Sequence, residues 1–134
     1  MKKTILIVDD NEDLTKGLRI FLRSHEYATL VAGDAVSAVS LAKNERPDLI
    51  ILDLGLPAGD GYLVMDRLSN ISTVSSTPVI VVSARDPEGH RQKSLEAGAK
   101  AFLQKPVDKQ VLLSTIDKVL KERCGASEVR QKDL

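Results

Sequence analysis

Residues 5–10 read Ile-Leu-Ile-Val-Asp-Asp, an unbroken apolar run that stops at two carboxylates. Three later apolar runs have the same form: two are followed directly by Asp53 and Ser83, and the third is followed by Gln104 and then Lys105. Short apolar runs bounded by polar turn residues are typical of strands that are covered on both faces in a parallel sheet. Because functional groups of such sheets collect beyond the carboxyl ends of the strands, we expect these polar side chains to share one crevice.

Segments with helical periodicity separate the apolar runs. The first helix is expected to begin near Asn11, which can cap a helix N-terminus, and the last to run from about Asp108 to Arg123. A short additional strand is expected at residues 28–32. Strands in strict alternation with helices predict an α/β domain of the flavodoxin-like class, with a doubly wound (βα)5 parallel sheet. The strand order 2-1-3-4-5, known from other sheets of this class, would place the strand that ends at Asp53 in the centre.

Composition limits the number of domains and the kinds of partner. A chain of 134 residues that is 43% hydrophobic is long enough for one domain with a full core. We expect this domain to occupy residues 3–122, and residues 123–134, which lack an apolar face, to form a tail or the start of a linker. Lys plus Arg equals Asp plus Glu at 19 each, so no basic field favours direct binding to nucleic acid or to an anionic membrane.

The cysteine content and the N-terminus predict a cytoplasmic location. Cys124 is the single cysteine, which leaves no disulfide framework and fits a reducing compartment, and we expect it to be an inert surface thiol. The apolar run after Lys3 is too short for the core of a signal peptide, and no segment is apolar enough to span a membrane. His25 and His90 are expected to be solvated helix residues.

The polar residues at the strand ends indicate phosphate chemistry. Asp9, Asp10 and Asp53 would repel one another in one crevice unless a cation compensates their charge, and a hard divalent metal such as Mg2+ binds through oxygens. The hydroxyl of Ser83 and the ammonium of Lys105 add the hydrogen-bond donor and the positive charge that a transferring phosphoryl group requires. Each residue taken alone would more often be a helix cap, a turn residue or a surface charge.

Four segments occur in an order and at a spacing that fit one domain. They are ILIVDDNE at 5–12, PDLIILDLGLPAGDG at 47–61, PVIVVSA at 78–84 and GAKAFLQKP at 98–106. Together they resemble the receiver domain of two-component response regulators, and the resemblance covers roughly residues 3–122. It implies a signalling domain that catalyses only its own phosphorylation and dephosphorylation. The phosphodonor would be a phosphohistidine of a sensor histidine kinase or of a histidine phosphotransfer protein.

The resemblance also implies a metal site and a phosphoacceptor. Asp53 would accept the phosphoryl group. Asp10, Asp53 and the backbone carbonyl of Gly55 would ligate Mg2+, for which Mn2+ can substitute, and Asp9 would act through a metal-bound water. This agrees with the tendency of Mg2+ to keep several waters and to take few protein ligands. Lys105 would pair with the carboxylates and then hold a phosphoryl oxygen, to which Ser83 would also donate.

A conformational switch is the third implication of the resemblance. Phe102 is similar to the aromatic that moves inward in the family when the hydroxyl at the Ser83 position approaches the phosphoryl group, but a phenylalanine in the fifth strand can equally be a core residue with no switching role. The responding surface would be the face formed by the fourth helix, the fifth strand and the fifth helix. The peptide bond between Lys105 and Pro106 is expected to be cis. The sequence does not identify the downstream effector.

Three other classes of protein share parts of this pattern. A flavodoxin-like cofactor binder would need phosphate donors after its first strand, where this chain has Asp9 and Asp10. An aspartyl-phosphate phosphatase would need a second acid two residues beyond Asp53, where this chain has Gly55. The alternative that stays open is an interaction module of the same fold that signals through partners without being phosphorylated. The modification of Asp53 in the presence of Mg2+ separates it from a working receiver.

Overall fold

The computed structural model of the chain describes residues 2–57 and 59–132, and the side chain of Cys124 lies outside the described part. Strands and helices alternate along the chain, as the sequence predicts. The strands are β1 (Thr4–Val8), β2 (Ala28–Ala32), β3 (Leu49–Leu52), β4 (Val79–Ser83) and β5 (Ala101–Gln104). The helices are α1 (Glu12–Ser24), α2 (Ala35–Glu45), α3 (Gly61–Ser69), α4 (Pro87–Glu96) and α5 (Lys109–Lys132).

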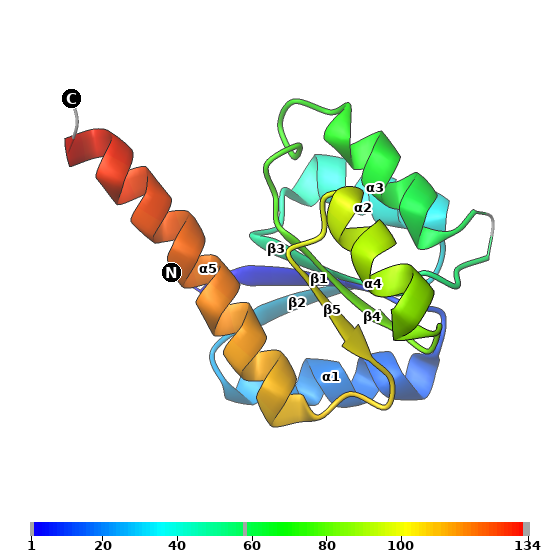
Figure 1. Cartoon of the computed structure of the whole chain (residues 1–134). Coiled ribbons are helices and arrows are strands. Elements are labelled where there is room, and N and C mark those ends of the chain that lie inside the picture. The colour runs from blue at the N-terminus through cyan, green and yellow to red at the C-terminus, as the bar shows by residue number, and fades with distance from the viewer. Residues whose placement is uncertain (1, 58, 133–134) are drawn as a thin grey trace.

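The strands form one parallel sheet in the order β2-β1-β3-β4-β5, which confirms the predicted topology (Figure 1). Helices α1 and α5 cover one face of the sheet, and α2, α3 and α4 lie on the other. Successive strand residues point to opposite faces, so Leu6 and Val8 pack toward α2 and α3 while Ile5 and Ile7 pack toward α1 and α5. Burial on both faces explains why these strands are continuous apolar runs in the sequence.

The helix α5 is longer than the sequence predicts. Its expected end was Arg123, where the apolar stripe stops, but the helix continues to Lys132. The added segment, residues 124–132, contains Ala, Glu, Arg, Gln and Lys, which favour helix, together with Gly125, which disfavours it. Whether it links to another domain stays a prediction. Within the described part of the chain, no helix has the length and apolarity to cross a bilayer.

Candidate functional site

The neighbouring strands β1 and β3 bring two carboxylates to the same edge of the sheet. Val8 and Leu52 pair in register at the strand ends, so the residues that follow them, Asp9 and Asp53, leave the sheet side by side. The backbone N–H of Asp53 donates to the carbonyl of Val8 (2.9 Å), and that of Asp9 donates to the carbonyl of Ala32 (3.0 Å). The sheet therefore fixes the backbone from which both carboxylates project.

Three carboxylates and one ammonium group meet at this edge. Carboxylate oxygens of Asp9, Asp10 and Asp53 lie within 4.8 Å of one another. The side chains of Asp9 and Asp53 are buried, whereas that of Asp10 is exposed. Lys105 Nζ lies 2.7 Å from Asp9 Oδ2 and 3.5 Å from Asp53 Oδ2. The structure thus brings together residues that are separated by almost the whole domain in sequence.

Burial and neighbouring charges perturb the ionisation of the site. Burial is the largest influence on the Asp53 carboxyl and raises its pKa; Lys105 lowers it, Asp9 raises it further, and the net pKa is raised. For Lys105 burial lowers the pKa, but its hydrogen bond to Asp9 and the charges of Asp53 and Asp9 outweigh burial and raise it. One ammonium group therefore does not compensate the carboxylates fully, and more positive charge would stabilise their ionised forms.

The donor set fits a hard divalent cation. All three side chains offer carboxylate oxygens, which are the ligands that Mg2+ prefers, and the cluster holds more negative than positive charge. The three carboxylates could therefore bind a divalent cation such as Mg2+. The backbone around Gly55 also approaches the cluster, because its N–H donates to Asp53 Oδ1 at 3.4 Å.

Ser83 lies at the end of β4, the strand next to β3. Its side chain is buried, and its hydroxyl oxygen accepts a hydrogen bond from the N–H of Arg85 at 3.1 Å. Its carbonyl accepts a hydrogen bond from the N–H of Lys105 at 2.8 Å, which ties the loop carrying Lys105 to β4. The peptide bond between Lys105 and Pro106 is cis.

Gly61 supports the site in a way that sequence reasoning missed. A Cβ atom at this position would lie 2.7 Å from the carbonyl oxygen of Asp53 and 2.9 Å from the Cα of Leu54. Only glycine lets the start of α3 approach the backbone of the phosphoacceptor candidate this closely. The preceding residue, Asp60, caps α3 by accepting a hydrogen bond from the N–H of Leu63 at 3.2 Å. The Gly-Asp-Gly sequence indicates a loop, but it does not reveal this backbone contact.

Aromatic residues near α4 also have partners that the sequence did not predict. His90, expected to be a solvated helix residue, is half-buried, and its Nδ1 lies 2.8 Å from the hydroxyl of Tyr62, a partner that the sequence did not predict. Lys93 Nζ lies 4.4 Å from the centre of the Tyr62 ring. Phe102 is buried, with 2% of its surface exposed, and the guanidinium of Arg91 lies over its ring. These contacts join α4 to α3 and to β5.

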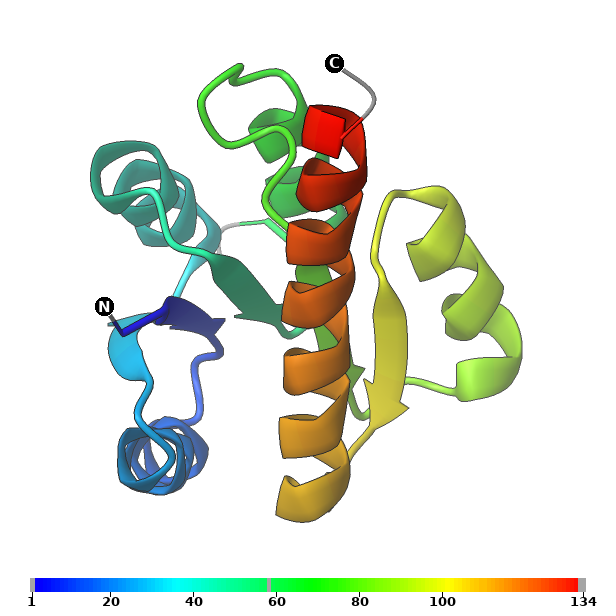
Figure 2. The same cartoon turned by 90° about the vertical axis from the view of Figure 1, so that its left-hand side faces the viewer.

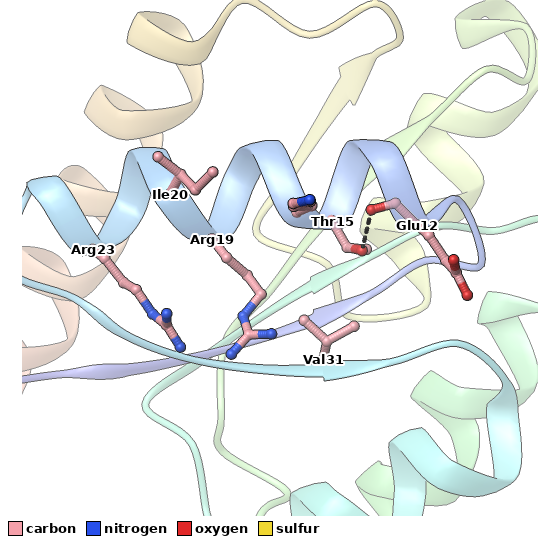
Figure 3. Close-up of a pocket in the computed structure, with 7 residues that line it drawn as sticks. Glu12, Thr15, Arg19, Ile20, Arg23 and Val31 are labelled. Atoms are coloured by element: carbon pink, nitrogen blue, oxygen red, sulfur yellow. Dashed lines mark hydrogen bonds between the residues drawn. The ribbon is translucent and has the colours of Figure 1, made fainter.

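A separate hollow lies between α1 and β2, with a volume of about 420 Å³. Figure 3 shows Arg19 and Arg23 reaching from α1 toward β2 beside it. Arg19 Nε donates a hydrogen bond to Thr29 Oγ1 at 3.3 Å, so one of the two arginines already has a partner on β2. The residues that line the hollow do not include the acidic cluster, and the candidate site is instead the polar edge formed by the strand ends.

The family model for the response regulator receiver domain matches residues 5–117. This range contains β2 to β5, all of β1 except Thr4, and every residue of the acidic cluster. The chain is a response regulator receiver domain. It is therefore a signalling domain of two-component systems rather than a classical enzyme, and its sheet order is that of the CheY-like fold.

Curated relatives differ in how much of their length this receiver matches. The protein PilH of Pseudomonas aeruginosa is 35% identical over 116 residues, which are 87% of this chain and 96% of PilH. The response regulator PleD of Caulobacter vibrioides is 33% identical over 133 residues, which are 99% of this chain and 29% of PleD. The receiver therefore spans less than a third of PleD but nearly all of PilH.

A solved structure with similar architecture contains a metal ion. It is the receiver domain of the sensor histidine kinase PA1611 from Pseudomonas aeruginosa, with a magnesium ion coordinated in its active-site cleft. It is 28% identical in sequence to this receiver, with a TM-score of 0.83, and the match covers 90% of this chain and 99% of that one.

Proposed function

We propose that Asp53 is the phosphoacceptor of a two-component phosphorelay. The observation that carries this proposal is the cluster itself, in which a buried carboxylate at the centre of the sheet has oxygens within 4.8 Å of two further carboxylates and 3.5 Å from the ammonium of Lys105. A carboxylate of this kind is a nucleophile that can form a covalent acyl phosphate. The phosphodonor would be the phosphohistidine of a sensor histidine kinase or of a histidine phosphotransfer protein.

In the proposed reaction, a carboxylate oxygen of Asp53 attacks the phosphorus of the donor. A bond forms between this oxygen and phosphorus, the phosphorus–nitrogen bond to the donor imidazole breaks, and the imidazole leaves with the bonding electron pair and takes up a proton. Negative charge spreads over the phosphoryl oxygens during the transfer, and positioned donors stabilise it. We expect the ammonium of Lys105, 3.5 Å from Asp53 Oδ2, and the hydroxyl of Ser83, at the end of β4, to supply them.

The proposed metal ligands are Asp10, Asp53 and the carbonyl of Gly55, with Asp9 acting through a metal-bound water. The bound Mg2+ or Mn2+ would neutralise charge on the phosphoryl oxygens. The all-oxygen donor set of this receiver supports the proposal, and so does the magnesium ion in the similar PA1611 receiver. Asp9 also holds Lys105 in place through its 2.7 Å contact.

The proposed output is a change in the surface formed by α4, β5 and α5. Phosphorylation of Asp53 would draw the hydroxyl of Ser83 toward the phosphoryl group and favour the buried position of Phe102. The pairing of β4 with β5 supports this coupling, because Val81 pairs with Phe102 and Ser83 pairs with Gln104. The partner that reads this surface is a protein whose chemistry the site does not specify.

The mass of the intact protein tests the proposal. After incubation with Mg2+ and acetyl phosphate, we expect one added phosphoryl group on the wild type, and none after chelation of the metal. Asp53→Asn should lose the addition, whereas Asp66→Asn, which changes an exposed aspartate on α3, should keep it. If neither acetyl phosphate nor a phosphorylated kinase modifies the wild type, the chain is a phosphorylation-independent interaction module.

The lifetime of the acyl phosphate gives a second measurement. Gly55 is exposed, and an added Cβ would meet no atom within 4 Å, so a larger side chain fits there without strain. We expect Gly55→Gln to change the rate of phosphoryl loss because its amide would lie beside the route of the attacking water. A decay rate equal to that of the wild type would contradict this role for position 55.

A further inference from the structure

Helix α4 has little apolar attachment to the rest of the receiver. Ser94 is its only buried residue, and Leu95, its large apolar side chain, is 38% exposed. A helix with so few buried apolar contacts depends on other interactions for its position on the domain. Two aromatic residues from neighbouring elements provide them, namely Tyr62 on α3 and Phe102 on β5.

Arg91 makes the contact with Phe102. Its guanidinium carbon lies 5.6 Å from the centre of the ring, which is within the range of a cation–π interaction. Its Nη1 also donates a long hydrogen bond of 3.5 Å to the carbonyl of Phe102. Arg91 therefore contacts both the side chain and the backbone of one residue on the adjacent strand, and it lies on the outer side of a ring that is otherwise in the core.

The position of Phe102 is linked to the acidic cluster through the backbone. Phe102 pairs with Val81 on β4, and Ser83 ends the same strand. The loop after β5 then carries Lys105, whose N–H donates to the Ser83 carbonyl. A shift of Phe102 on β5 would therefore act on the two segments that hold the proposed phosphoryl-binding side chains, the end of β4 with Ser83 and the loop with Lys105.

We infer that Arg91 is a positioning residue that holds the ring of Phe102 in its buried position and thereby favours phosphorylation of Asp53. The inference rests on the proposed function, in which the buried ring accompanies the phosphorylated state. Arg91 acts through Phe102 and does not touch the acidic cluster. An exposed cation–π contact corresponds to about a two- to fivefold change in the ratio of buried to outward ring positions.

The competing explanation is that apolar packing alone holds the ring. Phe102 packs with Val81 and Ala99 in the core on the α3 side of the sheet, and Arg91 would then only rest on its surface. In that case Arg91→Ala would leave the ring in its buried position, without line broadening, and would leave the phosphorylation rate unchanged. The two explanations differ in what they predict for variants of Arg91.

Fluorine NMR of the full chain labelled with 4-fluorophenylalanine separates them. The chain contains two phenylalanines, Phe102 and Phe21, so two resonances are expected. The ring of Phe21, whose centre lies 5.9 Å from Lys109 Nζ, belongs to α1 on the other face of the sheet. Its resonance therefore serves as an internal reference. We expect Arg91→Ala to move or broaden the Phe102 resonance and to leave that of Phe21 unchanged. Arg91→Lys keeps a cation above the ring and should restore part of the wild-type signal.

Lys93→Ala is the matched control, because it removes a cation from the same helix that lies over Tyr62 and not over Phe102. It should leave the Phe102 resonance in place. The same variants are then phosphorylated with acetyl phosphate and Mg2+. We expect the rate to fall about two- to fivefold in Arg91→Ala, to recover partly in Arg91→Lys, and to stay near the wild-type rate in Lys93→Ala.

An unchanged Phe102 resonance in Arg91→Ala would overturn the inference, and so would a shifted resonance with an unchanged phosphorylation rate. Failure of the proposed function has a different signature, since the wild type itself would then take no phosphoryl group. The fluorine spectrum needs no phosphodonor. Even if the wild type takes no phosphoryl group, an unshifted Phe102 signal in Arg91→Ala would therefore overturn the positioning role of Arg91.

Discussion

Helices α4 and α5 flank the edge strand β5, but they are attached to the sheet in different ways (Figure 2). Helix α5 buries an apolar stripe in which Leu112 and Ile116 are fully covered. Helix α4 buries Ser94 and is held through polar and aromatic contacts with Tyr62 and Phe102. Apolar burial makes a helix costly to displace, whereas contacts of about 1 kcal/mol each can be exchanged. We infer that, within the proposed surface of α4, β5 and α5, α4 is the element that a change at the acidic cluster would displace most.

The largest expected effect concerns the attachment of α5. Ile116→Ala removes a fully buried side chain from the core between α1, α5 and the sheet, and should lower the free energy of unfolding by about 2–5 kcal/mol. Leu95→Ala on α4 should cost less than about 1 kcal/mol because that side chain is partly exposed. Urea unfolding followed by circular dichroism measures both. Equal losses in the two variants would break the comparison.

Hydrogen exchange in the presence of a phosphodonor sharpens the comparison. If α4 responds to the site, acetyl phosphate with Mg2+ should slow amide exchange in α4 and β5 about tenfold, which corresponds to about 1.4 kcal/mol. Amides in the part of α5 that contains Leu112 and Ile116 should change little because their apolar contacts already protect them. Asp53→Asn is the control and should show no change. Equal protection of both helices in the wild type would contradict the assignment of α4 as the responsive element.

The polar attachment of α5 should depend on pH. The hydroxyl of Tyr27 donates a hydrogen bond to Asp117 on α5. Burial raises the pKa of Tyr27, and the hydrogen bond and the charge of Asp117 raise it further. The raised pKa means that the folded state favours the neutral phenol, so its stabilisation is fully present below the ordinary value of 10.0. This stabilisation is lost as the pH rises from 10.0 through the raised pKa that Tyr27 has in the folded state.

Tyr27→Phe should therefore lower the free energy of unfolding by about 1 kcal/mol at pH 8, a value already reduced for the partial exposure of the contact. The difference between the variant and the wild type should shrink above pH 10 as the unfolded tyrosine ionises. Urea titrations at pH 8 and pH 11 test this. A difference that stays constant over this range would show that Tyr27 acts through packing and not through its hydroxyl.

The smallest expected effect concerns the contact of α4 with α3. Tyr62→Phe removes the hydroxyl that faces His90 Nδ1 and keeps the ring under Lys93. Because the pair is partly exposed, we expect a loss of about 0.5 kcal/mol in the free energy of unfolding. Amide exchange in α4 should accelerate about twofold while exchange in α5 stays unchanged. Accelerated exchange in both helices would show that Tyr62 stabilises the whole domain rather than α4.

Local patterns explain how much of the fold the sequence predicts. The strands that lead to Asp9, Asp53 and Ser83 are apolar runs because the sheet is covered on both faces, and the number and order of the strands matched the structure. The end of α5 was missed because a helix that continues beyond its apolar stripe depends on intrinsic propensity, which is a weak signal. The contact of His90 with Tyr62 was not predicted because a histidine on a helix surface gives no sign of the tyrosine that faces it.

The sequence by itself determined the element order and which polar residues lie at the strand ends, because both follow from apolar runs and helical periods along the chain. Tertiary structure alone decided the contacts between distant segments. It set Lys105 Nζ at 2.7 Å from Asp9, brought the start of α3 against the backbone of Asp53, and placed Arg91 over Phe102. Such contacts depend on how the helices pack on the two faces of the sheet, and no local pattern encodes a distance between residues on different elements.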